Sequence, residues 1–202
     1  MRTGRLEAFS DGVIAILITI MVLELKVPLS APKFGDLEPL LPIFLSYVMS
    51  FVYLGIYWNN HHHLFQVVDR VNGRILWANL HLLFWLSLIP FATGWMGENS
   101  FAPATVALYG VNLLLSGLAY SLLQIAILRA PGGNRILADA IGRDFKGKTS
   151  LILYSAAVAL SFLSRTAACA VYVLVALIWL IPDPRIERAL ATQVQDDRDK
   201  TD

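Results

Sequence analysis

Two groups of polar side chains interrupt a sequence that is otherwise strongly apolar. The first lies in RLEAFSDG, near the N-terminus, and contains Arg5, Glu7, Ser10 and Asp11. The second lies in YWNNHHHLF and in the segment that follows it, and it comprises Asn59, Asn60, His61, His62, His63, Asn79 and His81. Histidine, carboxylate and amide groups gathered within a membrane relay protons, ligate a metal or haem, or form a hydrogen-bond network.

The spacing of these residues discriminates between the possible chemistries. A hydrolase is disfavoured because Ser10 and Asp11 are adjacent and no oxyanion-hole motif accompanies them. A metal site is disfavoured because consecutive histidines project about 100° apart on a helix and no i, i+4 ligand pair is present. A network that fixes the first helix is the favoured interpretation. Haem held by His62 or His63 with His81, and proton relay through histidines, stay open as alternatives.

The composition requires a membrane environment for these residues. Hydrophobic residues make up 56 % of the 202 positions, charged residues only 15 %, and the mean hydropathy is +0.60. Such a chain has too little polar surface to cover a soluble globule. Its net charge of +1 gives no reason to expect nucleic acid. The single cysteine, Cys169, excludes an intrachain disulfide.

Six uncharged runs predict an all-α polytopic membrane protein with six transmembrane helices per subunit. The runs are Gly12–Leu23, Pro39–Val68, Ile75–Gly97, Asn99–Leu128, Thr149–Ser164 and Thr166–Pro182. Arg165 separates the last two, which we expect to form a tight hairpin with this side chain reaching the interface. Residues 1–182 are thus predicted to form one transmembrane domain, and residues 183–202 a polar cytoplasmic tail.

The distribution of basic residues predicts the orientation. With six spans both termini share one side, and that side holds thirteen of the sixteen lysines and arginines, against three on the other. Because basic residues are retained on the cytoplasmic side, both termini are predicted to be cytoplasmic.

The first uncharged run has only twelve residues, about 18 Å of helix, whereas the hydrocarbon core is about 30 Å thick. We therefore expect this helix to lie inside a bundle with water at both ends. Asp11 points away from its main apolar stripe, so its partner is expected among the histidines and asparagines of another helix. The stripe itself consists of Arg5, Phe9, Gly12, Ile16, Ile20, Leu23 and Val27, with Thr19 at its edge. In a symmetric oligomer with this helix at the axis, the stripe would line a pore closed by hydrophobic rings.

The segment RLEAFSDGVIAILITIMVLELKVP carries the pattern Arg-x-x-x-Phe-Ser-Asp, and YWNNHHHLF and WANLHLLFWLSLIPFATGWMGE follow it. In these residues the chain resembles prokaryotic members of the transmembrane protein 175 family of potassium channels. The resemblance covers the first three predicted helices well and the remainder only by hydropathy. Ile14 and Leu17 depart from the family pattern, in which an aromatic and a small residue are expected.

The resemblance implies a homotetrameric, potassium-permeable channel in the inner (plasma) membrane of a prokaryote, without enzymatic activity or cofactor. It implies a constriction at Ile16, Ile20 and Leu23 with a hydroxyl layer at Thr19. Arg5, Phe9, Ser10 and Asp11 would anchor the first helix, and Glu24, at the outer mouth, would attract monovalent cations. The alternative function is a proton-coupled secondary transporter, or a proton leak, that uses the histidines and Asp11.

Overall fold

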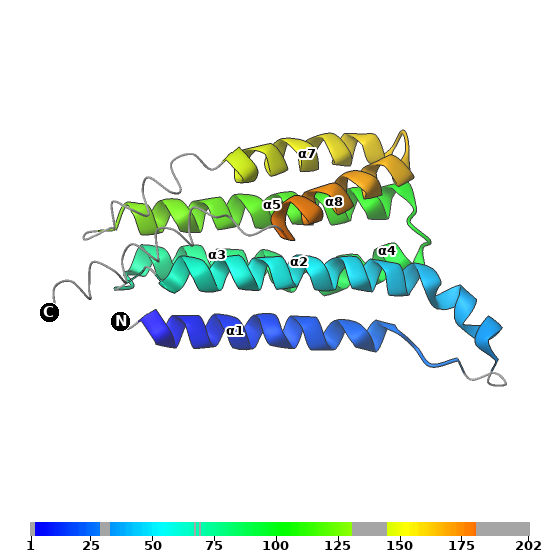
Figure 1. Cartoon of the computed structure of the whole chain (residues 1–202), viewed down its shortest axis with the longest axis horizontal. Helices are drawn as coiled ribbons and strands as arrows, with labels where there is room; N and C mark the ends of the chain where they lie inside the picture. The colour runs from blue at the N-terminus through cyan, green and yellow to red at the C-terminus, as the bar shows by residue number, and fades with distance from the viewer. Residues whose placement is uncertain (1–2, 29–32, 67, 69, 131–144, 181–202) are drawn as a thin grey trace, which may run out of the picture.

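Helices arranged side by side along one long axis make up the structure, a computed structural model that describes residues 3–28, 33–66, 68, 70–130 and 145–180 (Figure 1). Two short 3-10 helices, η1 (Met21–Glu24) and η2 (Phe34–Leu40), precede α2 in the chain. The α-helices are α1 (Thr3–Ile20), α2 (Leu41–Gln66), α3 (Gly73–Ser87), α4 (Ile89–Glu98), α5 (Pro103–Leu128), α7 (Phe145–Ser161) and α8 (Arg165–Leu180). α3 and α4 together form one span, Gly73–Glu98. Counted in this way, the helices confirm the predicted all-α fold with six helical segments.

Four of these segments are long and apolar enough to cross a bilayer. They are Thr3–Glu24, Phe34–Gln66, Gly73–Glu98 and Pro103–Leu128. The first contains 22 residues, a rise of about 33 Å, because the helix already begins before the charged residues of RLEAFSDG. The prediction of a first helix only about 18 Å long is therefore wrong: uncharged length underestimates a helix whose polar residues find partners on its neighbours.

The third predicted span is broken between α3 and α4. Pro90 has no N–H group and stands in the first turn of α4, so the helix restarts at Ile89 after Leu88. With its amide oriented to satisfy both groups, Asn112 of α5 donates to the Trp85 carbonyl over 2.9 Å and accepts from the Ile89 N–H over 3.1 Å. The backbone groups at the break are thus satisfied within the bundle, as a hydrocarbon environment requires.

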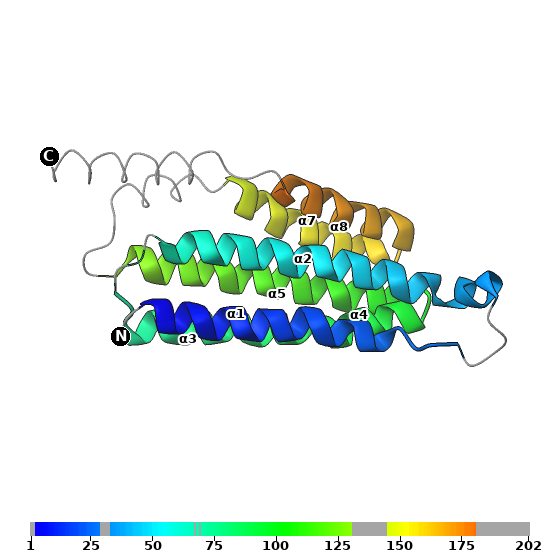
Figure 2. The same cartoon turned by 60° about the horizontal axis from the view of Figure 1, so that its bottom comes forward.

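The core has two parts, and they place α1 at the edge of the subunit. One apolar cluster joins α1, α2, α3 and α5, and a second joins α2, α4, α5, α7 and α8. Both views show α1 on one side of the bundle and the α7–α8 pair on the other (Figures 1 and 2). Within one chain α1 packs mainly on α2 and α3 and leaves one face open, so the central position expected for this helix is a position in the oligomer.

The α7–α8 hairpin has the predicted form. The last residue of α7, Ser161, and the first of α8, Arg165, are separated by three residues. The Arg165 guanidinium donates to the carbonyl of Ser100, in the turn before α5, over 3.0 Å. The predicted tail, residues 183–202, lies outside the described residues.

Candidate functional site

The two sides of α1 have different surroundings. Its buried side consists of Leu6, Ser10, Ile14, Leu17 and Met21, spaced by three or four residues as one face of a helix requires. Ile14 is 0 % exposed and Leu17 is 6 % exposed. The two departures from the family pattern therefore lie where α1 packs on its own subunit and not on its open face.

A directional chain of hydrogen bonds ties the buried side of α1 to α2 and α3. The Nε2–H of His61 donates to the Oδ1 of Asn79 over 2.7 Å, because an amide oxygen can only accept. The amide Nδ2 of Asn79 donates to the hydroxyl of Ser10 over 2.9 Å, and that hydroxyl donates to the Leu6 carbonyl over 2.9 Å. All three side chains are fully buried, so the chain fixes how the three helices meet.

A second set of contacts joins α1 to α2 at its more exposed side. Glu7 accepts a hydrogen bond from His62 Nδ1 over 2.9 Å, while His62 Nε2 accepts one from the Gln66 amide over 2.9 Å. These two bonds assign His62 the tautomer protonated at Nδ1. One helical turn along, Asp11 accepts from the indole N–H of Trp58 over 3.1 Å.

This second set corrects one prediction and adds three residues. Asp11 does find its partner on another helix, but that partner is Trp58 and not a histidine or asparagine. Glu7, Trp58 and Gln66 were not among the predicted site residues. Their spacing was visible: Glu7 and Asp11 are four apart on α1, and Trp58, His62 and Gln66 are four apart on α2. Two such rows meet when two helices pack with their polar edges together.

The remaining members of the predicted polar layer do not join these contacts. Asn59 is exposed, and Asn60 donates to the Ile56 carbonyl of its own helix over 2.8 Å. His81 is exposed and accepts from the Trp85 indole of its own helix over 2.9 Å. His63 is half-buried, and its Nδ1 has no hydrogen-bond partner within the described part of the chain.

These positions bear on the metal and haem alternatives. His62 is engaged by Glu7 and Gln66, and His81 lies about 200° around α3 from Asn79, the residue that faces α1 and α2. The structure therefore does not pair His81 with His62 as haem ligands. Among the described residues, no three His, Cys, Asp or Glu side chains are grouped closely enough to hold a metal ion.

The open side of α1 carries the predicted pore stripe. Ile16 is 60 % exposed, Ile20 41 % and Leu23 74 %. Thr19 is also exposed, and its hydroxyl donates to the Ile16 carbonyl over 2.9 Å, so the hydroxyl oxygen keeps its capacity to accept. Arg5 and Phe9 lie on this side too and make no hydrogen bond or ion pair with any described residue, so within the subunit only Ser10 and Asp11 of the four signature residues make polar contacts with other helices.

The far end of α1 is held by α4. The carboxylate of Glu24 lies against Gly94, where an added Cβ would stand 3.0 Å from the Glu24 Cδ and Oε2 atoms. Two residues further on, Lys26 Nζ lies 3.3 Å from the Glu98 carboxylate. Glu24 is therefore at the predicted end of the helix, and its carboxylate lies against α4.

Residues 5–90, which contain the partners of Glu7, Ser10 and Asp11 on α2 and α3, match the family described as Endosomal/lysosomal potassium channel TMEM175. Over 190 residues the chain is 58 % identical to a protein of Chryseobacterium sp. (strain P1-3) named as a potassium channel, and the match covers 94 % of this chain and 98 % of that protein. The chain belongs to the TMEM175 family. The resemblance found in the sequence is thus confirmed.

Other TMEM175 relatives extend this assignment to the fold. The crystal structure of a lysosomal potassium-selective channel TMEM175 homolog from Chamaesiphon minutus superposes with a TM-score of 0.75 at 31 % identity, covering 89 % of this chain and 96 % of that one. A human relative, named an endosomal/lysosomal proton channel, is 32 % identical over 99 residues, which cover 44 % of this chain and 20 % of that protein. The TMEM175 fold therefore extends beyond α4 to the α5–α8 region.

Proposed function

We propose that this TMEM175 protein is a potassium-permeable cation channel, a homotetramer in which α1 lines the pore. The observation that carries the proposal is the separation of the two sides of α1. One side is tied to its own subunit by buried polar contacts, and the other presents an uncovered stripe with an arginine, a threonine and large apolar residues. Two bacterial relatives support the same function, because one is named a potassium channel and the other is described as a homolog of a potassium-selective channel.

The composition of the stripe argues for a water-filled axis. An arginine facing lipid costs about 2.5–3.5 kcal/mol at mid-membrane and less toward the interface, and a pore removes that cost. One α1 helix cannot enclose a conduit, whereas several copies related by a rotation axis can. Residues 1–182 would then act as a single channel domain in each subunit.

In such a pore each exposed residue of α1 forms a ring. Rings of Ile16, Ile20 and Leu23 make narrow apolar constrictions that stop ion flow when they lose water. A ring of Thr19 hydroxyls replaces part of the water shell of a passing cation. Selectivity from such rings is expected to be modest beside that of a carbonyl cage, and the Glu24 carboxylates raise the local concentration of cations near the outer mouth.

The membrane context follows from the charge distribution. The side that carries thirteen basic residues is assigned to the cytoplasm, with both termini, in the plasma membrane of a prokaryote. The contacts of Ser10, Asp11 and Glu7 lie near the cytoplasmic end and hold α1 in place there. The contacts of Glu24 and Lys26 hold its outer end.

A proton pathway is the second candidate, because His61, Asn79 and Ser10 form a continuous chain and the human relative is named a proton channel. Against it, the chain ends on the Leu6 backbone carbonyl, which has no proton to pass on. Single-channel recording with potassium on one side and sodium on the other separates the candidates. Unitary currents whose reversal potential follows the potassium gradient support the channel, and saturable flux without unitary steps supports a carrier.

A further inference from the structure

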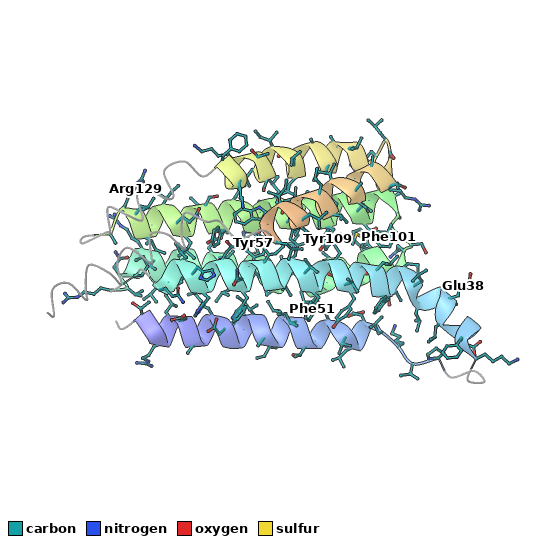
Figure 3. The ribbon with its side chains drawn as sticks, in the orientation of Figure 1. Glu38, Phe51, Tyr57, Phe101, Tyr109 and Arg129 are labelled. Atoms are coloured by element: carbon teal, nitrogen blue, oxygen red, sulfur yellow. The ribbon has the colours of Figure 1, made fainter. Side chains whose placement is uncertain are left out.

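An open cleft of about 860 Å³ lies at the end of the bundle where α1 begins. It is lined by Asn72, Gly73, Arg74, Trp77 and Arg129. Arg129 lies at that end of α5, opposite to Phe101 (Figure 3). Two arginines from helices far apart in sequence thus meet around one hollow that the proposed conduction pathway does not use.

Both arginines are available to a ligand. Arg74 and Arg129 are exposed, and neither forms an ion pair with any residue that the structure describes. Arg74 stands in the first turn of α3, where the Asn72 side chain caps the helix by accepting the Ile75 N–H. Backbone N–H groups of that first turn add positive potential beside the two guanidinium groups. The cleft is therefore a strongly cationic site.

The level of the cleft in the membrane indicates the kind of anion. Gly73–Glu98 and Pro103–Leu128 are both long enough to span a bilayer, so Arg74 and Arg129 stand at the ends of membrane spans. Trp77, one turn further into α3, is 75 % exposed. Tryptophan at this level typically contacts the boundary between lipid headgroups and acyl chains. A ligand in the cleft thus meets positive charge at one end and an indole ring at the other.

We propose that this cleft binds the headgroup of an anionic phospholipid, with the phosphate between Arg74 and Arg129 and the glycerol and upper acyl chain against Trp77. Guanidinium groups bind phosphate oxygens in a bidentate manner, and the Asn72 side chain adds polar capacity at the rim. A lipid is preferred to free phosphate because only a lipid uses the exposed indole. Basic pockets at the cytoplasmic ends of membrane helices commonly bind anionic lipids.

Native mass spectrometry of the intact oligomer, purified in detergent with equal amounts of phosphatidylglycerol and phosphatidylcholine, tests the site. We expect phosphatidylglycerol to be retained preferentially. Each of Arg74→Gln and Arg129→Gln should weaken its binding by about fivefold, and the double variant by about 25-fold. Lys148→Gln is the control, because Lys148, near the start of α7, is also basic and exposed but does not line the cleft.

Elution of each variant as the same oligomer shows that it is folded. The number of lipid molecules bound to each variant then tests the site. Equal retention of the two lipids by the unmodified protein would overturn the proposal. So would an equal loss of phosphatidylglycerol in Lys148→Gln. Full displacement of the lipid by millimolar glycerol phosphate would show that the site takes a free anion, and this would also overturn it. Retention by Trp77→Ala at a reduced level, with the arginines intact, would support the lipid assignment.

Discussion

The amide of Asn79 donates to the hydroxyl of Ser10 over 2.9 Å, in a region where both side chains are fully buried. This bond joins α1 to α3, and its continuation through His61 joins α2. In this series of hydrogen bonds each donor has one acceptor. Removing any of the three side chains therefore leaves at least one buried polar atom without a partner. The position of α1, and with it the exposed stripe, depends on this contact.

Replacing Asn79 with leucine should destabilise the protein, because it leaves buried polar atoms without hydrogen-bond partners. His61 Nε2 and Ser10 Oγ would both lose a partner, and an unsatisfied buried group costs about 1–3 kcal/mol. Thermal or denaturant unfolding of the purified oligomer in detergent measures the loss. Asn59→Leu is the control, since Asn59 is exposed and should change stability by less than about 0.5 kcal/mol. Equal losses in the two variants would contradict a special role for Asn79.

The contact between Trp58 and Asp11 should appear as coupling in a double-mutant cycle. Trp58→Phe keeps the ring but removes the indole N–H, and Asp11→Ala removes the acceptor. We expect a coupling free energy of about 1 kcal/mol, below the usual range for a charged acceptor because water reaches both groups. Additive effects of the two changes would show that the bond contributes nothing to stability in solution.

The periodicity of α1 predicted its exposed stripe, but one helix cannot predict how its neighbour is rotated. Ile16, Ile20 and Leu23 follow from spacing alone, and all three are exposed as the stripe required. Which of three consecutive histidines meets α1 depends on the rotation of α2, and a change of about 100° exchanges His61 for His62. The sequence therefore placed the polar layer at the right end of the bundle without assigning its pairs.

The break within the third span and the full length of α1 were not predicted, and the reasons differ. The sequence shows Pro90 within the third span. A break there is tolerated in a membrane because Asn112 of α5 supplies hydrogen-bond partners to the freed backbone groups, and this contact cannot be predicted from the sequence of the span itself. The length of α1 was underestimated because charged residues were read as its boundary. Glu7 and Asp11 lie inside the helix and are matched by His62 and Trp58.

Gly97→Ala should destabilise the protein, because α2 and α4 pack closely at this position. A Cβ on Gly97 would stand 2.7 Å from the Ile43 Cα and 2.6 Å from the Ser46 hydroxyl, and the backbone atom cannot move aside alone. We expect a loss of about 1–3 kcal/mol, typical of overpacking. Gly55→Ala is the matched control: a Cβ there meets nothing within 4 Å, and alanine stabilises a helix by about 0.5–1 kcal/mol relative to glycine. Opposite signs for the two variants in the same unfolding assay are the expected result.

Ile16→Asn should increase potassium flux if the exposed face of α1 lines a pore. The change places a ring of amides at an apolar constriction, which holds water there and lowers the barrier to a hydrated ion. A barrier lowered by ~1.4 kcal/mol raises the rate about tenfold, and flux into liposomes loaded with a potassium indicator measures it. Ile152→Asn is the control, because Ile152 is 69 % exposed, close to the 60 % of Ile16, but belongs to α7, the helix on the opposite side of the bundle from α1 (Figure 1). Unchanged flux in Ile16→Asn, or an equal rise in Ile152→Asn, would show that α1 does not carry the constriction.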